Sequence, residues 1–192
     1  MGETKNRSKE APRAGAVLWL TRTAILIALL VAWQWATNPL GITLLTGSGV
    51  NLILIAAVTL AGLPSGLCVA LISPVLAFVF GIPKFLPLVP FIAAGNAILV
   101  LAWHFASKIR LPKMPAVWAV AAVAGALLKF AFLYFAIVRI AIPVFGIVPE
   151  QAAPQISVMF GVSQLITALI GGAIAVAVLT MIGGRIKPER IY

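Results

Sequence analysis

The sequence is poor in the side chains from which most catalytic and metal sites are built. Its 192 residues include four glutamates, no aspartate, one histidine and one cysteine. A single histidine cannot form a multi-histidine metal site, and a single cysteine excludes a disulfide framework and a thiolate metal site. The four glutamates all lie outside the apolar segments, which argues against paired-carboxylate catalysis and an acidic proton relay. They are Glu3, Glu10, Glu150 and Glu189.

Nucleotide and protease motifs are missing as well. The sequence contains neither a G-x-x-x-x-G-K-[ST] loop nor an H-E-x-x-H pair, so ATP hydrolysis by that loop and zincin chemistry are excluded. No nucleophile–base pair can be named. We therefore expect a protein that is not an enzyme and that needs no metal or other cofactor.

Long apolar runs dominate what is present. Hydrophobic residues make up 62% of the chain and charged residues only 9%, with a mean hydropathy of +1.14. This composition is typical of an integral membrane protein, and a chain of this kind crosses the bilayer as helices. The net charge of +10 does not indicate a nucleic-acid partner. The basic residues form short clusters between apolar runs, and a role in orienting the helices explains these clusters better than nucleic-acid binding does.

The apolar runs predict an all-α membrane protein, a bundle of six transmembrane helices. The expected spans are residues 16–36, 50–61, 67–80, 88–107, 116–139 and 156–182. Residues 1–15 are expected to be a disordered basic cytoplasmic tail, 16–184 the transmembrane domain and 185–192 a second basic cytoplasmic tail. Residues 37–49, which are polar and rich in Gly and Pro, are expected to form a long outer loop.

The basic residues orient this bundle. With six spans, both termini share one side, and that side holds most of the lysines and arginines. Only Lys84 and Arg139 lie on the other side, and Lys129 lies within a span. By the positive-inside rule, both termini are cytoplasmic.

Three strong polar residues fall at one depth in the outer half of the bilayer. At about 1.5 Å per residue, Lys129 lies roughly 15 Å from the outer end of its span, and Asn96 and Gln164 lie roughly 12 Å from theirs. Small residues share the helix face of Lys129, so that face is expected to point into the protein. They are Ala122, Gly125 and Ala126.

These residues predict a cavity for a small polar or anionic ligand. Tyr134 and Phe160 would supply apolar walls, and Arg139 would lie at the outer mouth. Two simpler interpretations stand beside this one. The polar residues would then only join helices by hydrogen bonds, with Lys129 extending outward, and Arg139 would be an ordinary interfacial charge.

The first span carries alanines at every fourth position. Ala24, Ala28 and Ala32 share one helix face, and such spacing permits close contact with another helix. The spacing fits equally a contact within this chain and a docking face for a partner.

Taken together, three segments resemble the substrate-binding S components of energy-coupling factor (ECF) transporters, in an uncharacterised branch of that family. They are Arg22–Ala28 (RTAILIA), Asn51–Ala57 (NLILIAA) with Pro64-Ser65-Gly66, and Gln164–Gly172 (QLITALIGG). The resemblance implies six helices and capture of a vitamin or related micronutrient at the outer side, with 37–49 as a lid. It also implies that Ala24, Ala28 and Ala32 dock on a transmembrane T component that works with cytoplasmic ATPase subunits.

Two functions follow from the sequence. The first is a solute-capture subunit in a prokaryotic plasma membrane, with a small anionic micronutrient held by Asn96, Lys129 and Gln164. The second is a membrane scaffold without a solute, whose polar residues only hold helices together. A polar cavity open toward the outer face favours the first function, and a filled bundle favours the second.

Overall fold

The computed structural model describes residues 4–81, 84–109 and 114–183, with residues 4–14 as backbone only. Within these ranges all regular secondary structure is helical. The α-helices are α1 (Thr4–Thr37), α2 (Thr43–Ala61), α3 (Leu63–Val79), α4 (Val89–Ala106), α5 (Met114–Leu133), α6 (Ile142–Phe145), α7 (Ala153–Phe160) and α8 (Val162–Gly183). Two 3-10 turns, η1 (Asn38–Leu40) and η2 (Leu86–Leu88), precede α2 and α4, and a π-helical segment, η3 (Tyr134–Ala141), joins α5 to α6.

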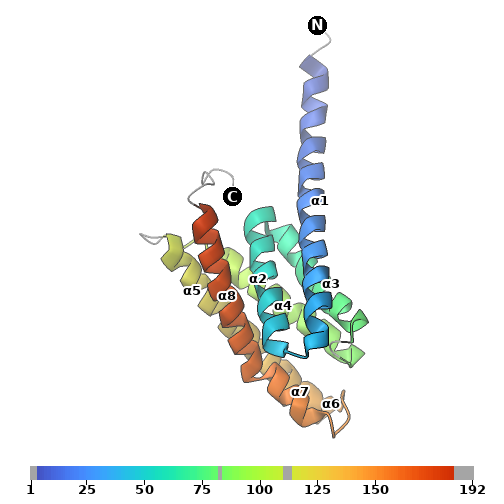
Figure 1. The fold of residues 1–192 in the computed structure, drawn as a ribbon. Coiled ribbons are helices and arrows are strands. Elements are labelled where there is room, and N and C mark those ends of the chain that lie inside the picture. Colours follow the sequence, from blue (N-terminus) through green and yellow to red (C-terminus); the bar gives the residue numbers. More distant parts are fainter. Residues whose placement is uncertain (1–3, 82–83, 110–113, 184–192) are drawn as a thin grey trace.

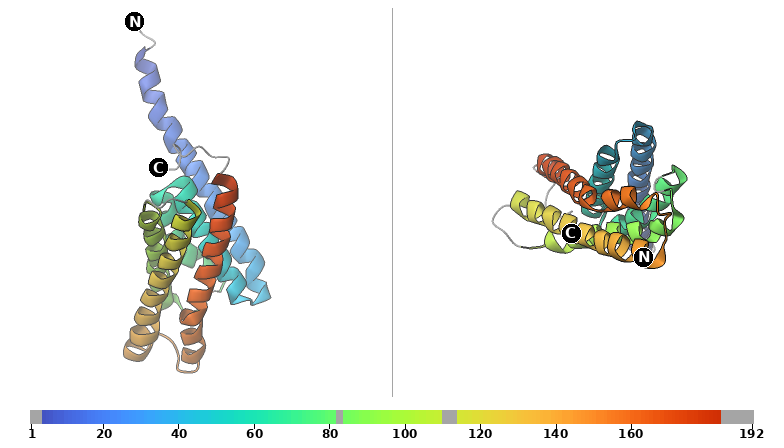
Figure 2. Two further views of the ribbon diagram at one scale, coloured as in Figure 1. Left: turned by 90° about the vertical axis from the view of Figure 1, so that its left-hand side faces the viewer. Right: turned by 90° about the horizontal axis from the view of Figure 1, so that it is seen from below.

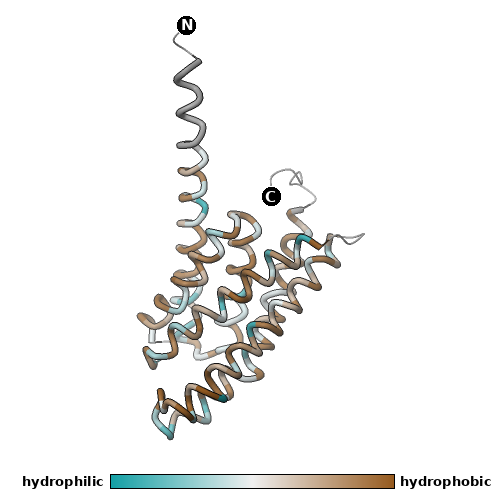
Figure 3. The backbone as a smooth tube through the Cα atoms, turned by 180° about the vertical axis from the view of Figure 1, so that it is seen from behind, coloured by the Kyte–Doolittle hydropathy of each residue, from teal (hydrophilic) through white to brown (hydrophobic). Residues whose placement is uncertain are grey.

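Five helical segments are long and apolar enough to cross a membrane. They are Gly15–Leu40, Thr43–Ala61, Leu86–Ala106, Met114–Phe145 and Ala153–Ile182. The helix Leu63–Val79 is also apolar but is shorter than these five. Figure 3 shows hydrophobic residues along the length of these helices. Many large apolar side chains are exposed, as expected for helices surrounded by lipid. The prediction of a multi-pass helical membrane protein is confirmed at this level.

Helix α2 lies at the centre of the bundle and α1 at its edge. Helix α2 packs against α1, α3, α4 and α8, and α5 packs against α4 and α8. Helix α1 packs mainly against α2 and α3, and its N-terminal part extends beyond the other helices (Figures 1 and 2). The beginning of α1 and the end of α8 lie at the same end of the bundle (Figure 1).

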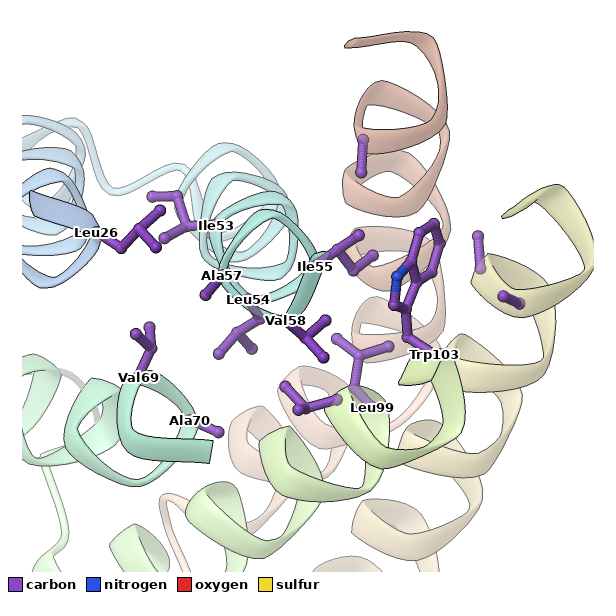
Figure 4. Close-up of a cluster of buried hydrophobic side chains, with 14 of the residues drawn as sticks. Leu26, Ile53, Leu54, Ile55, Ala57, Val58, Val69, Ala70, Leu99 and Trp103 are labelled. Carbon is purple, nitrogen blue, oxygen red and sulfur yellow. The ribbon is translucent and has the colours of Figure 1, made fainter. Parts of the chain in front are cut away.

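The largest apolar cluster joins α1, α2, α3 and α4 with α5 and α8. Leu26 of α1, Leu54 of α2, Val69 of α3 and Leu99 of α4 meet there (Figure 4). Trp103 is also buried in this cluster, and its indole Nε1 donates a hydrogen bond to Thr59 Oγ1 at 2.9 Å. The apolar packing fixes the relative positions of the helices that carry the polar residues described below.

The predicted outer loop 37–49 is mostly helical, so that prediction is wrong. Helix α2 begins at Thr43, and only residues 38–42 separate it from α1, with η1 among them. The small residues serve close packing instead of a turn. Gly47 faces Thr167 of α8, and at Gly49 a Cβ would overlap the ring of Trp33 in α1. Glycine is tolerated in a membrane helix where it lets a neighbour approach.

Other boundaries differ by a few residues. Helix α3 begins at Leu63, so the connection between the expected spans 50–61 and 67–80 is the single residue Gly62. Its φ of +90° is a conformation that glycine adopts readily. The expected span 116–139 continues to Phe145. The π-helical segment η3 places Pro143 in the first turn of α6, where its missing N–H costs little.

The structure describes most of the first predicted tail and none of the second. Helix α1 already begins at Thr4 and so includes most of the expected disordered tail 1–15. That segment contains several good helix formers, which allow the helix to extend past the apolar span. The predicted tail 185–192 lies outside the described residues.

Gly171 of α8 lies in close contact with α2, and Gly171→Ala is expected to destabilise the bundle. A Cβ at this position would overlap the backbone carbonyl oxygen of Ser48. Since a backbone atom cannot rotate aside, we expect a loss of about 1–3 kcal/mol in the free energy of unfolding. Thermal unfolding in detergent measures the loss. Gly15→Ala is the matched control, because nothing lies within 4 Å of a Cβ there; equal melting temperatures for the two variants would contradict the prediction.

Candidate functional site

A cavity of about 710 Å³ lies at the end of the bundle opposite the beginning of α1 and the end of α8. Its walls come from the last turns of α1, the first turns of α2, the end of α3, the first turns of α4, Lys129 near the end of α5 and residues 149–164. Exposed residues such as Gly41, Thr43 and Lys84 form its rim, whereas Gln34, Asn51, Asn96 and Lys129 at its floor are buried. The cavity is therefore open at the rim and enclosed below.

A buried lysine lies at the cavity floor. Lys129 of α5 is 3% exposed, and its Nζ donates one hydrogen bond to Asn51 Oδ1 of α2 and one to Asn96 Oδ1 of α4, both at 2.7 Å. The ammonium thus joins three helices at one point. It has three N–H donors, and these two bonds leave the third for a group in the cavity.

The charge at this site is not balanced by the protein. Both amide partners are neutral, and none of the described lining residues is a carboxylate. Lys84 is a second lining cation, but it is exposed at the rim. Burying an ammonium without an opposite charge is costly, so the floor of the cavity is suited to an anionic group.

Carboxamide side chains gather around the same cavity. All four glutamines of the chain, and every asparagine except Asn6, line it. The seven residues are Gln34, Asn38, Asn51, Asn96, Gln151, Gln155 and Gln164. In a chain with so few polar residues inside its apolar segments, this concentration at one place marks the cavity as the candidate site.

Two of these carboxamides help to hold the walls. Gln34 Nε2 donates to the carbonyl oxygen of Ser73 in α3 at 3.2 Å, and its buried Oε1 has no partner among the described residues. Asn38 Nδ2 donates to the carbonyl oxygen of Phe80 at 2.5 Å. These bonds tie the end of α1 to the end of α3, across the cavity wall.

Four of the six predicted site residues line this cavity. Asn96 and Lys129 are in direct contact, and Gln164 and Phe160 lie in the wall formed by α7 and α8. The depth comparison thus placed three polar residues of α4, α5 and α8 around one space.

The structure does not bring Tyr134 and Arg139 to the cavity. Tyr134 lies beside Phe130 and Phe135 with ring centroids 5.8 and 5.6 Å away, and Arg139 is exposed. Five residues advance a helix by about 140° beyond one full turn, so Tyr134 cannot share the face of Lys129. Contrary to the prediction, Tyr134 is not a wall of the cavity and Arg139 does not lie at its mouth.

Asn51 is the main residue that the sequence analysis missed. A span that began at residue 50 would put Asn51 at the membrane surface. Because α2 begins at Thr43, Asn51 lies eight residues, or about 12 Å, inside the helix, at the same depth as Asn96. A search for every amide in the apolar runs, independent of their predicted ends, would have found it.

The alanines of α1 face away from the bundle. Ala24, Ala28 and Ala32 are all exposed, whereas the buried stripe of α1 includes Leu26 and Leu30. These alanines therefore do not form a packing contact within the described part of this chain.

The fold and the cavity define a class: a multi-pass helical membrane protein with an amide-lined cavity around a buried lysine. Within the described residues, no cluster of three or more His, Cys, Asp or Glu side chains is placed to hold a metal ion. No family model, no curated protein and no solved structure matches the chain.

Proposed function

We propose that this protein is the solute-capture subunit of an ECF-type importer in a prokaryotic plasma membrane and binds a small anionic micronutrient. The observation that carries the proposal is the buried Lys129 ammonium at the floor of an open cavity, which has a free donor and no acidic partner among the described residues. An anion bound there would supply the missing charge, and a charge-assisted hydrogen bond is stronger than a neutral one.

The position of the cavity supports capture from outside. In this proposal α3, whose 17 residues span about 25 Å, is the sixth transmembrane helix. The chain termini, with most of the basic residues of the sequence, are cytoplasmic. The cavity lies at the opposite end of the bundle and therefore faces the outer side.

The outward alanine face of α1 supports a membrane partner. In the proposed importer, Ala24, Ala28 and Ala32 contact a transmembrane T component. Cytoplasmic ATPase subunits supply the energy, since the sequence has no G-x-x-x-x-G-K-[ST] loop for ATP hydrolysis. Because the three alanines are exposed, the face is free for close helix–helix packing.

Ala28→Trp is expected to prevent co-purification with the T component without changing the stability of the isolated subunit. The indole would hold the partner helix away from α1, while it projects from an exposed position and disturbs no packing within the chain. Pull-down of the T component and thermal unfolding of the isolated subunit measure the two effects. Leu29→Trp, a substitution at an exposed neighbour on a different face, is the control. Retained pull-down, or a loss of stability, would contradict the docking assignment.

A scaffold without a solute is the second candidate. The bonds from Lys129 to Asn51 and Asn96 connect three helices, as polar residues that stabilise a bundle would do. Stabilisation alone does not account for a 710 Å³ cavity or for the carboxamides that line it. The cavity therefore favours solute capture.

The direct test is mass spectrometry of small molecules that co-purify with the full-length protein in detergent. We expect an anionic small molecule with the parent protein, and its loss from Lys129→Met prepared in parallel. A parent protein that carries no small molecule and binds none from a metabolite mixture would exclude the proposed function and leave the scaffold.

A further inference from the structure

Three glutamines of the cavity can hydrogen-bond the part of the solute that does not contact Lys129. Gln151, Gln155 and Gln164 line the cavity, and within the described residues none of their side chains forms a hydrogen bond to the protein. Gln151 precedes α7 and Gln155 lies in its first turn, four residues later, while Gln164 lies near the start of α8. Each offers a donor NH2 group and an acceptor oxygen.

A second anionic group on the solute is not matched by this lining. Among the described residues, the only cation besides Lys129 that lines the cavity is Lys84. Lys84 is exposed, where water and salt screen its charge. Recognition of a planar dianion or a phosphate often uses arginine, and no arginine lines the cavity in the part of the chain that the structure describes. A cationic group is not matched either, since no described lining residue is a carboxylate.

A purely hydrocarbon acid is matched poorly as well. Its apolar part would displace water from the glutamine carboxamides without replacing their hydrogen bonds, and a desolvated polar group without a partner is costly. A solute with its own N–H donors and carbonyl or ring-nitrogen acceptors would pair with them. The buried, unpartnered Oε1 of Gln34 adds a fourth carboxamide whose acceptor is unused.

We propose that the solute is a monoanion whose second part is an amide, a urea or a nitrogen heterocycle. Its carboxylate or other anionic group binds Lys129 at the floor, and its donor–acceptor group pairs with Gln151, Gln155 and Gln164 nearer the rim. This inference rests on the proposed function and names the chemical class of its solute.

The test uses two series of ring-matched probes with the full-length protein in detergent. The first series is pyroglutamate, cyclopentanecarboxylate and 2-pyrrolidone; the second is orotate, benzoate and uracil. In each series one compound has both the acid and the lactam or imide, one has the acid alone and one has the neutral ring alone. A site that hydrogen-bonds its ligand discriminates strongly against analogues without those groups. We expect the first compound of each series to bind at least about tenfold more tightly than the other two, by isothermal titration calorimetry.

A paired substitution assigns the effect to the glutamines. Gln151 and Gln155 are exposed, so Gln151→Leu combined with Gln155→Leu should fold normally. We expect this variant to bind pyroglutamate about tenfold more weakly and cyclopentanecarboxylate at least as tightly as the parent does, because the leucines remove carboxamides that a hydrocarbon ring would desolvate. Ser157→Ala, a substitution in α7 outside the cavity lining, is the control and should bind both acids as the parent does.

The outcomes separate this inference from the proposed function. Equal affinity for the lactam acids and the ring-matched hydrocarbon acids, with binding that still needs Lys129, would overturn the inference and leave solute capture intact. Equal loss of both acids in the double glutamine variant would also overturn it. If no acid of either series binds and no small molecule co-purifies, the proposed function and this inference fall together.

Discussion

Lys129→Met is expected to remove most of the affinity for an anionic solute while the bundle stays folded. Methionine keeps the length and apolar bulk of the side chain and deletes only the ammonium. Loss of one partner of a buried, hydrogen-bonded charge pair typically costs about 2–5 kcal/mol, or a roughly 30-fold to several-thousand-fold weaker affinity. We expect a loss in this range for the anion identified by co-purification.

The stability of the same variant should be unchanged or slightly higher. The substitution removes a buried charge that has no opposite charge beside it within the described residues. It also leaves Asn51 Oδ1 and Asn96 Oδ1 without their lysine donor, but both residues line the cavity, where water can take the place of Nζ. Melting temperature and affinity measured on one preparation give both quantities.

Lys84→Met is the matched control. It deletes the same kind of charge from the exposed rim of the same cavity, where screening keeps the contribution small. We expect less than about a tenfold change in affinity. A scaffold predicts the opposite pattern for Lys129→Met, a lower melting temperature with any solute binding unaffected, and that result would remove Lys129 from the site.

The helix positions could be predicted from the sequence because long apolar runs have only one stable form in lipid. The boundaries were less predictable where the same residue types serve two purposes. Gly47 and Gly49 look like a loop in the sequence, but in the structure they let α2 approach α8 and α1. Whether a glycine ends a helix or lets another helix pack against it depends on its neighbours in space. The order of residues along the chain does not reveal these neighbours.

The polar site was partly predictable for a related reason. Depth along a helix follows from residue number, so Asn96, Lys129 and Gln164 could be placed at one level. Rotation around the helix and the position of its first residue are more sensitive to error. An error in rotation placed Tyr134 in the predicted site, and an error in the first residue of α2 left Asn51 out of it. The contact of Asn51 with Lys129, at 2.7 Å, is among the shortest polar contacts of the cavity.

Asn51→Asp is expected to reduce the affinity for the anion about as strongly as deletion of the ammonium. The side chains have the same shape, so a carboxylate oxygen can take the position from which Asn51 Oδ1 now accepts a hydrogen bond from Lys129 Nζ. The new ion pair would cancel the positive charge of the floor and place a negative charge beside the bound anion. Juxtaposition of like charges costs several kcal/mol, and we expect at least a roughly hundredfold weaker affinity.

The readouts for this variant distinguish loss of charge from loss of structure. Since the ammonium gains a charged partner and keeps its bond to Asn96, the melting temperature should be equal to or higher than that of the parent. Asn96→Asp should reproduce both effects, because Asn96 Oδ1 holds the other bond to the same nitrogen. Gln155→Glu puts a carboxylate at the exposed rim and should change the affinity far less. Unchanged affinity in both aspartate variants would mean that the anion binds elsewhere, because no solute could contact Lys129 without responding to a carboxylate at 2.7 Å from its nitrogen.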